Sequence, residues 1–473
     1  MNAGADALGL MDAIAARLGV AGVRRDVSDL ATYGTDRCRG PWPVAPLGVA
    51  LPATTAEVQD VVRLCAAHGV KIVPSGGRTG LCGGAVATGG ELVLSLERMR
   101  QVLWVDRTAG LLRCEAGTTV EAVQAAASEV GLMYPVDFAA KGTAQIGGSI
   151  ATNAGGVKVL RYGSTRAWVS ALSVVVASGE CLEVGGSLVK DNTGYDLRQL
   201  FIGAEGTLGI IVAATLRLTR PPAGVVVALC AVLDDASIVN LFARAQRGLT
   251  LQAFEYLEHA CLEHVLEHRA RTGGPFAEPS HAYVLIEAEV SDVGEAEAVS
   301  VRLTELLAAA ADAGEIVDAV VATTAAQQRE LWALREDISE SLHRHHPHKG
   351  DVSLPIDHIP AFLERWRKLV ADAVPGATPL SFGHIGDGNL HLNVLPSPVA
   401  DAAELQARWI DYDARTYALV AAEGGSISAE DGIGLLKRAH LHHRWGPAEL
   451  ATMRAIKQAL DPTGLFNPGK ILS

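Results

Sequence analysis

The hydrophobic positions of this chain fall into short apolar runs separated by longer amphipathic stretches. Residues 48–74 show the pattern clearly, because the apolar GVALP and KIVP flank TTAEVQDVVRLCAAHGV, whose apolar residues recur at helical spacing. Thr54 or Thr55 is the expected N-cap of that helix. The segment is therefore predicted to form a strand, a helix and a second strand, in the manner of a βαβ unit.

The same alternation extends along the rest of the chain. Residues 91–222 contain strand-like runs, one clear helix (TVEAVQAAASEVG) and a predicted hairpin, VVVASGECLEV, that turns at Ser178 and Gly179. Between 223 and 426, apolar strands alternate with long Ala-, Leu- and Glu-rich helices, which predicts an α+β domain. Glycine motifs return from 427 onward. We therefore expect domains at 1–222 and 223–426, with 427–473 coming back to the first.

Length and charge narrow the class of protein. A chain of 473 residues with 49% hydrophobic residues predicts at least two globular domains with large cores. The net charge of −13 leaves no electrostatic footprint for nucleic acid. Seven scattered cysteines without C-x-x-C spacing indicate reduced thiols and a cytoplasmic location. The first twenty residues have the pattern of an amphipathic helix rather than of a signal peptide, and no apolar run is long enough to span a bilayer.

Three glycine-rich segments indicate a cofactor. They are PSGGRTGLCGG (74–84), GTAQIGGSIATNAGG (142–156) and GAEGTLGI (203–210). Consecutive backbone N–H groups in such turns form concavities that bind phosphate. The spacing is neither that of a Rossmann fingerprint nor that of a P-loop. Three such segments favour a large nucleotide cofactor that is held by backbone contacts.

The stretch SFGHIGDGNLHLNV (381–394) places two histidines on either side of a Gly-Asp-Gly turn. If Ile385 faces Leu390 in a hairpin, His384 faces His391, and directly opposed residues hold their Cβ atoms about 4.5–5.5 Å apart. That is close enough for two imidazoles to bind one metal ion, and Asn393 then points to the same side. The alternative is a pair of ordinary strand histidines on a polar face.

Several segments together resemble the FAD-linked 2-hydroxy-acid dehydrogenases of the vanillyl-alcohol-oxidase-like flavoprotein superfamily. They are PSGGRTGLCGGA, IGGSIATNAGG, RYGSTRAWV, KDNTGYDLRQLFIGAEGTLGII, FGHIGDGNLHLNV, SISAEDGIG and LDPTGLFNPGKIL, in order along nearly the whole chain. The resemblance implies an α+β protein, with a split FAD-binding domain of two α/β subdomains and a ferredoxin-like antiparallel cap domain.

The resemblance also implies which residues hold FAD. Residues of the first two glycine loops would bind the diphosphate, and residues elsewhere would line other parts of the cofactor: Ser75, Gly76, Gly77, Arg78, Thr79, Gly80, Gly142, Thr143, Gly147 and Gly148, then Thr152, Asn153, Glu205, Ile211 and Asn467. Related enzymes attach the flavin to a histidine, and the loop 74–84 contains none. We interpret Cys82 as a packed thiol and expect non-covalent FAD.

In the resembling dehydrogenases, two histidines and a glutamate bind a divalent metal, which implies His384, His391 and Glu430 as ligands of Zn²⁺ or Mn²⁺ here. The branch that acts on D-2-hydroxyglutarate grips the distal carboxylate of its substrate. The matching residues are Arg335, Ser339 and Lys349, and Asn393 is expected to contact substrate as well. Arg335 and Ser339 are spaced to share a helical face. We interpret the histidines between 343 and 348 as a solvated loop.

One residue departs from the family pattern, because Asp431 stands where the family has the histidine that takes the hydroxyl proton. Asp431 is the candidate base, and the alternatives are a fourth metal ligand and an engineered substitution in an otherwise active enzyme. The leading hypothesis is oxidation of D-2-hydroxyglutarate to 2-oxoglutarate, with electron-transfer flavoprotein or a quinone as acceptor, by a homodimer. The alternatives are a D-lactate or D-malate dehydrogenase, and a flavin- or metabolite-binding protein whose turnover is impaired by Asp431.

Overall fold

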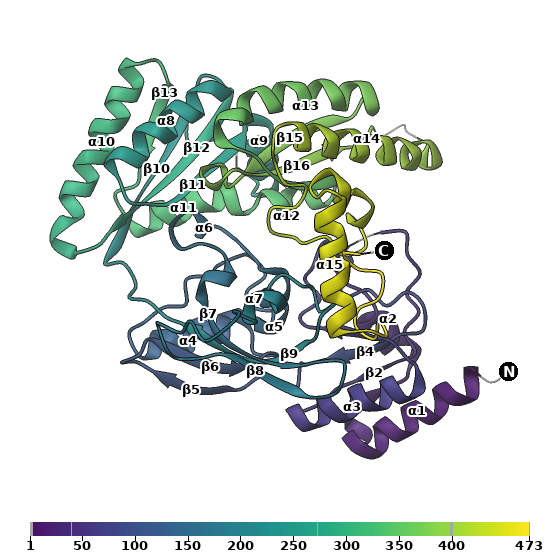
Figure 1. Ribbon diagram of the computed structural model, residues 1–473. Coiled ribbons are helices and arrows are strands. Elements are labelled where there is room, and N and C mark those ends of the chain that lie inside the picture. The colour runs from purple at the N-terminus through teal and green to yellow at the C-terminus, as the bar shows by residue number, and fades with distance from the viewer. Residues whose placement is uncertain (1–2, 39, 272, 398–400, 473) are drawn as a thin grey trace. The chain divides into compact units, whose positions relative to one another are not determined.

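The computed structural model describes residues 3–38, 40–271, 273–397 and 401–472, and the chain divides into two compact units (Figure 1). The first unit comprises residues 1–156, 163–221 and 430–473, and the second comprises 157–162 and 222–429. The predicted N-terminal helix is present as α1 (Ala3–Leu18), and its first two residues lie outside the described part.

The first unit contains two sheets. The four-stranded sheet has the order β1-β2-β4-β3, in which β2, β4 and β3 are parallel and β1 is antiparallel. The five-stranded sheet has the order β5-β6-β9-β7-β8 and is antiparallel. The strands are β1 (Val23–Arg24), β2 (Gly48–Ala50), β3 (Ile72–Ser75), β4 (Leu92–Ser95), β5 (Val102–Asp106), β6 (Leu111–Glu115), β7 (Val169–Val175), β8 (Cys181–Gly185) and β9 (Ile210–Arg217).

Short-range interactions in the sequence explain where a helix begins and where a hairpin turns in the first unit. The Thr54 side chain accepts a hydrogen bond from the Glu57 backbone N–H and caps α3, as one of the two predicted threonines should. The predicted hairpin is confirmed as β7 and β8, with Gly179 at φ 78° in the turn. The other helices are α2 (Val27–Tyr33), α3 (Thr55–His68), α4 (Val120–Glu129), α5 (Ile146–Thr152), α7 (Arg198–Phe201) and α15 (Pro447–Leu460).

The second unit is built on one seven-stranded antiparallel sheet of order β13-β10-β12-β11-β15-β16-β14. This sheet with its helices is the α+β arrangement that the alternating pattern predicted. The strands are β10 (Gly224–Val232), β11 (Leu251–Glu258), β12 (Ala282–Val290), β13 (Ile316–Val321), β14 (His348–Ser353), β15 (Thr378–Gly383) and β16 (Asn389–Leu395).

Helices cover both faces of this sheet. Side chains of α9, α11 and α12, among them Leu262, Leu334 and Ile338, form a buried core against one face. Helices α8, α10 and α13 lie on the other side of the sheet in Figure 1. The helices are α8 (Asp235–Gly248), α9 (His259–His268), α10 (Ala296–Asp312), α11 (Ala325–Glu336), α12 (Ile338–His343), α13 (Ile359–Ala373) and α14 (Ala402–Ala422).

A short helix, α6 (Val159–Tyr162), belongs to the second unit although the expected boundary placed it in the first. The reason is a set of ion pairs with β12. Lys158 pairs with Glu287, and the Arg161 Nε atom lies 2.7 Å from a carboxylate oxygen of Glu289. The periodicity of a sequence cannot predict such long-range ion pairs. The expected boundary at residue 222 therefore assigned this segment to the wrong domain.

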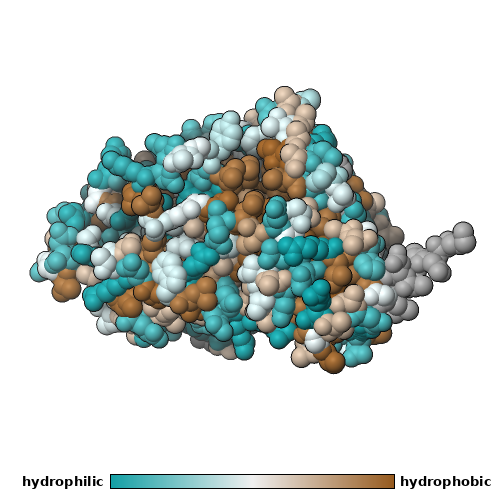
Figure 2. All heavy atoms as spheres, turned by 60° about the horizontal axis from the view of Figure 1, so that its bottom comes forward, coloured by the Kyte–Doolittle hydropathy of each residue, from teal (hydrophilic) through white to brown (hydrophobic). Residues whose placement is uncertain are grey.

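Most residues of the apolar runs are buried, and the surface is mixed in character. On the face shown in Figure 2, hydrophobic residues lie between hydrophilic ones. No helix in the described part of the chain is both long enough and apolar enough to cross a membrane. All seven cysteines lie in that part and are free thiols, as their spacing predicted.

Candidate active site

The first two glycine loops touch each other in the first unit. Ser75 ends β3, and the loop that follows passes so close to the second glycine segment that a Cβ atom on Gly77 would lie 2.1 Å from the carbonyl oxygen of Thr143. Only glycine permits that approach. A Cβ atom on Gly76 would lie 3.8 Å from the Cα atom of Gly148. The two segments predicted to bind the diphosphate therefore form one continuous backbone surface.

Residues from two further segments, around Glu205 and Asn467, converge on the same region. The backbone N–H of Glu205 donates to Ala151 at 2.8 Å, and the Asn467 side-chain amide donates to the carbonyl oxygens of Glu205 and Gly84 at 2.7 and 2.9 Å. Arg78, Asn153, Glu205 and Asn467 all have positive φ angles between 42° and 56°. Such conformations are costly for non-glycine residues and cluster at ligand sites.

The polar atoms of this region fit a nucleotide cofactor. In the described part of the chain, the Ser75 Oγ, Gln145 Oε1 and Asn467 Oδ1 atoms are buried and make no hydrogen bond within the protein. Buried polar atoms are nearly always satisfied, so three orphans around a glycine cradle indicate a polar ligand. The remaining residues expected to contact FAD lie on or beside these segments: Thr79, Gly80, Gly142, Gly147, Thr152 and, on β9, Ile211.

Glu205 has a structural role that the sequence did not suggest. Its carboxylate accepts hydrogen bonds of 2.7 Å from the backbone N–H groups of both Ile433 and Gly434. Burial raises the pKa of Glu205, and these two bonds oppose that rise. Glu205 therefore anchors the C-terminal segment within the first unit.

Cys82 is a packed thiol in the structure. It is buried, and its Sγ atom lies 3.2 Å from the backbone carbonyl oxygen of Gly432, which accepts the S–H hydrogen bond. The thiol is therefore engaged in holding the loop 74–84 against the C-terminal segment.

In the second unit, the two histidines of the hairpin are neighbours, but not in the register that the sequence predicted. His391 pairs with Phe382 rather than with His384, because residues 385–387 form a 3₁₀ turn that takes His384 out of the strand. The shift is two residues, which keeps each side chain on its face. The two imidazole rings lie 5.3 Å apart between centroids.

Each histidine has a buried carboxylate beside its Nδ1 atom. For His384, the two carboxylate oxygens of Glu255 lie at 2.8 and 2.9 Å, and for His391 the nearest oxygen of Asp351 lies at 3.7 Å. Burial alone raises the pKa of Glu255, but the charges of His384 and Arg335 outweigh it and lower that pKa. An ionised carboxylate only accepts, so the Nδ1 atom of His384 donates to Glu255, and its Nε2 atom is the one left for a metal ion. Carboxylates orient metal-binding histidines in this way.

A third potential ligand completes the group. In the described part of the chain, His384, His391 and Glu430 are the one set of such side chains whose ligand atoms all lie within 4.8 Å of one another. Glu430 directly follows Ala429, whose backbone N–H donates to the Asp351 carboxylate at 3.0 Å. Desolvation, then the charge of His384, lowers the pKa of His391, which favours the neutral imidazole that binds metal. Two imidazoles and one carboxylate have the chemistry of a catalytic metal centre.

Two of the expected substrate contacts lie on the face of the sheet that carries His391. In the pairing of β14 with β16, Lys349 is opposite Asn393, and Asp351 is opposite His391. Opposed residues point to the same side, and so do residues two apart in one strand. Lys349 is exposed and Asn393 is buried.

Arg335 is placed behind His384. Its Nε atom lies 2.9 Å from a carboxylate oxygen of Glu255, and its guanidinium lies over the Phe382 ring at 5.0 Å. Its Nη2 atom is buried and makes no hydrogen bond within the described residues. Arg335 thus joins the polar group around the histidines and keeps donor capacity for an anion.

Ser339 does not share a helical face with Arg335 as predicted. Helix α11 ends at Glu336, and α12 begins at Ile338. Asp337 between them has ψ −2°, far from the value of about −42° in a regular helix, and this turns the next residues away. Ser339 is exposed, whereas Arg335 is buried. The expectation of one helical face was therefore wrong.

The histidines between 343 and 348 do not form a metal group with one another among the described residues. His348 stacks on Trp409 at 4.4 Å between centroids, and its Nε2 atom lies 2.7 Å from a carboxylate oxygen of Asp413. These contacts give His348 a role in packing.

Asp431 follows the third ligand directly and belongs to the first unit. Burial and the charge of Asp36 raise the pKa of the Cys38 thiol to about 11, and Asp431 adds to that rise. The Asp431 carboxylate therefore lies near Cys38 within the first unit.

Sequence reasoning missed Glu255, Asp351 and Gln145. Glu255 is 1% exposed within the apolar strand LQAFEYLE, and a buried acid in such a strand was the available signal. Asp351 and Gln145 carry no comparable signal, because neither lies within an apolar run of strand length.

Two family models match this chain. The model described as "FAD linked oxidases, C-terminal domain" covers residues 221–471, and the model described as "FAD binding domain" covers residues 46–185.

Several curated proteins of high similarity are D-2-hydroxyglutarate dehydrogenases. A D-2-hydroxyglutarate dehydrogenase of Xanthomonas citri is 47% identical over 95% of this chain and 94% of its own length. One of Stutzerimonas stutzeri is 41% identical over 95% of this chain and 96% of its length. A mitochondrial D-2-hydroxyglutarate dehydrogenase of Bos taurus is 40% identical over 89% of this chain and 76% of its length.

Solved structures share the fold at low identity. A p-cresol methylhydroxylase aligns over 99% of this chain and 97% of its own with a TM-score of 0.78 and 16% identity. An alkyldihydroxyacetonephosphate synthase aligns over 97% of this chain and 85% of its own, with a TM-score of 0.71 and 17% identity. These structures confirm the predicted vanillyl-alcohol-oxidase-like architecture with an FAD-binding domain and a cap domain.

Proposed function

The chain belongs to the D-2-hydroxyglutarate dehydrogenase family of FAD-linked oxidases, and from its site we propose that it oxidises D-2-hydroxyglutarate to 2-oxoglutarate. The observation that carries the proposal is the group of His384, His391 and Glu430, beside a lysine and an arginine that suit a dicarboxylate. When bound, FAD supplies the acceptor for the hydride that leaves C2 of the substrate. The residues around the glycine cradle, with their orphaned polar atoms, are proposed to hold the cofactor.

We propose that His384, His391 and Glu430 hold a divalent metal, Zn²⁺ or Mn²⁺. The ligand types and the carboxylates behind the imidazoles support this assignment. Such an ion supplies a Lewis acid for the 2-hydroxyl and carboxylate groups of a 2-hydroxy acid. In this proposal, Glu255 and Asp351 orient the imidazoles, and Asp431 receives the proton of the hydroxyl group.

The distal carboxylate of the substrate is assigned to Lys349, Asn393 and Arg335. Lys349 and Asn393 lie on the face that carries His391, and Arg335 offers a buried donor behind His384. Ser339 is a weaker candidate for this contact because it is exposed beyond the helix break.

Replacing Lys349 with alanine tests the dicarboxylate assignment. Hydrogen bonds to charged groups contribute about 1.5–3 kcal/mol, so kcat/KM for D-2-hydroxyglutarate is expected to fall by at least about tenfold. Turnover of D-lactate, which has no distal carboxylate, should stay within about twofold of the unmodified protein. Lys368→Ala, at an exposed lysine of α13, is the matched control. Unchanged kcat/KM for D-2-hydroxyglutarate in Lys349→Ala would refute the assignment and favour D-lactate, which has no distal carboxylate, as substrate.

Precipitation with acid tests whether FAD is held without a covalent bond. The Cys82 thiol is buried against Gly432, and the loop 74–84 contains no histidine. We therefore expect all flavin absorbance in the supernatant after precipitation. Flavin that stays with the pellet, and is absent from a Cys82→Ser pellet, would identify a thioether bond instead.

A second candidate function is favoured by Asp431. A protein that binds flavin and a 2-hydroxy acid without turnover would arise if the aspartate were a poor base. Anaerobic mixing with D-2-hydroxyglutarate separates the two functions, because bleaching of the flavin absorbance is expected only from a dehydrogenase.

The acceptor that reoxidises the flavin is proposed to be electron-transfer flavoprotein or a quinone. A homodimer and a cytoplasmic location, the latter expected from the reduced thiols, are likewise proposals.

A further inference from the structure

Strands β11 and β15 meet through the shortest backbone pairing in the middle of the seven-stranded sheet. The described register contains Tyr256 opposite Gly383 and Leu257 opposite Phe382. By contrast, β10 and β12 pair from Gly224 to Val232. Two backbone pairs give little resistance to sliding of one strand along the other. This seam nevertheless places His384 beside Glu255.

Side chains extend the pairing by one position at each end of the seam. At one end, the Glu258 carboxylate accepts hydrogen bonds of 2.9 Å from both the backbone N–H and the hydroxyl group of Ser381. At the other end, the Nδ1 atom of His384 lies 2.8 Å from Glu255. Residues 381–384 thus oppose residues 258–255 in one unbroken register, in which the outer two contacts depend on glutamate side chains.

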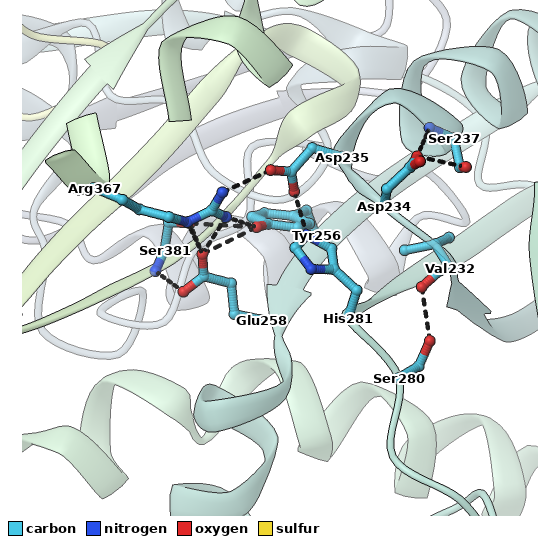
Figure 3. A network of polar contacts seen from close by, with 10 residues as sticks. All are labelled: Val232, Asp234, Asp235, Ser237, Tyr256, Glu258, Ser280, His281, Arg367 and Ser381. Atoms are coloured by element: carbon cyan, nitrogen blue, oxygen red, sulfur yellow. Dashed lines mark hydrogen bonds and ion pairs between the residues drawn. The ribbon is translucent and has the colours of Figure 1, made fainter. Parts of the chain in front are cut away.

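A partly buried polar network holds Glu258 in place (Figure 3). The Arg367 guanidinium from α13 lies between two carboxylates, 2.6 Å from Glu258 and 2.7 Å from Asp235 at the start of α8. Asp235 also lies 2.8 Å from the Nε2 atom of His281. The Tyr256 hydroxyl donates to Glu258 at 3.3 Å. The network therefore joins α8, α13, β11 and β15 at one point.

The network and the two histidines lie on opposite faces of the seven-stranded sheet. Successive side chains of a strand alternate between faces, so Tyr256 and Glu258 point away from the face of Glu255. The network therefore does not contact the proposed metal group, and acts on it only through the position of the strands.

We propose that Asp235, Arg367 and Glu258 form a positioning network that sets the register of β15 against β11, and so the position of His384 relative to Glu255. This inference rests on the proposed metal centre. Two N–H donors of Arg367 contact one oxygen of Glu258, and this clamp keeps the carboxylate on the Ser381 N–H. Without it, a carboxylate at the edge of the core would turn toward water. His384, three residues further along, receives its placement from that contact.

Replacing Glu258 with alanine is the central test. It leaves the Ser381 N–H without its carboxylate, so β15 is expected to shift and the affinity for Zn²⁺, measured by chelator competition, to fall about tenfold. Changes behind metal ligands typically cost 10- to 100-fold in affinity or activity, and this network is one step further away. A comparable fall in kcat/KM for D-2-hydroxyglutarate is expected.

Two further variants show whether metal binding depends on the register of β15 or on the charge of Glu258. Glu258→Gln keeps an oxygen that accepts from the Ser381 N–H, so most of the lost metal affinity should return. Ser381→Ala removes only the hydroxyl bond and keeps the backbone bond, so its affinity should stay within about twofold of the unmodified protein.

Glu315→Ala is the matched control for a general loss of stability. Glu315 has the same side-chain exposure, 13% against 12% for Glu258, and a bidentate ion pair with Arg244 at the far edge of the same sheet. We expect both alanine variants to lower Tm, and only Glu258→Ala to weaken metal binding.

Four outcomes decide the inference. The inference is overturned if Glu258→Ala binds the metal as tightly as the unmodified protein does. It is also overturned if Glu315→Ala loses as much metal affinity as Glu258→Ala. An unmodified protein that binds no metal would overturn the proposed centre and the positioning role together. If Glu258→Ala does not fold, Arg367→Lys keeps the charge but not the clamp. Metal affinity reduced at least about threefold in that variant supports the inference, and unchanged affinity contradicts it.

Discussion

Replacing His391 with alanine is expected to abolish metal binding and to lower kcat for D-2-hydroxyglutarate by about 10³-fold, while FAD stays bound. His391 is one of three proposed ligands, and two remaining ligands do not make a stable catalytic centre. Coordination of a substrate oxygen contributes several kcal/mol to the reaction, which corresponds to a loss of about this size.

The measurement combines metal analysis, flavin absorbance and single-turnover kinetics on the same preparation. The residues proposed to hold FAD belong to the first unit and His391 to the second, so flavin content should remain stoichiometric. His259→Ala is a matched control, because His259 is a partly exposed histidine of the same unit that contacts Tyr283. Stoichiometric metal in His391→Ala would refute the proposed centre, and loss of FAD would show that the variant is misfolded.

Substitutions at Asp431 are expected to lower kcat when alanine is introduced and to raise it when histidine is introduced. General-base catalysis contributes about 10²–10⁴-fold, so Asp431→Ala should lower kcat by at least about 10²-fold. Asp431→His should raise kcat at pH 7–8 by about tenfold. The reason is that an ordinary histidine has a pKa near 6.5 and an ordinary aspartate one near 3.9, and a base works best with a pKa near the operating pH.

The pH profile gives the second readout for Asp431. With histidine in place, kcat should gain a limb near the pKa of an imidazole, which the aspartate protein lacks. Asp431→Asn is the matched variant that keeps the shape and removes the base. Equal or lower turnover in Asp431→His, with metal and FAD intact, would show that the site is built around aspartate. Full turnover in Asp431→Asn would show that another group receives the proton.

The sequence predicted most of the fold because its signals are local. Apolar runs of strand length, the capping threonine of α3 and the turn at Gly179 each act within a few residues, and each element is present in the structure. The motif blocks likewise indicated a flavoprotein, which the family models and relatives confirm. The placement of α6 in the second unit escaped prediction, because its ion pairs with β12 join residues more than a hundred positions apart.

For the site, the sequence alone indicated the two histidines and the three glycine loops, whose chemistry suits metal and phosphate, and its resemblance to a known family added the glutamate. Tertiary structure decided how they are arranged. A 3₁₀ turn at 385–387 shifted the hairpin by two residues, and the ψ angle of Asp337 separated Ser339 from Arg335. Folding also brought Glu255 and Asp351 behind the imidazoles and Glu258 onto Ser381. These contacts depend on which strands become neighbours in the sheet. The hydrophobic pattern of a strand predicts which of its side chains face the core, but not which strand it pairs with.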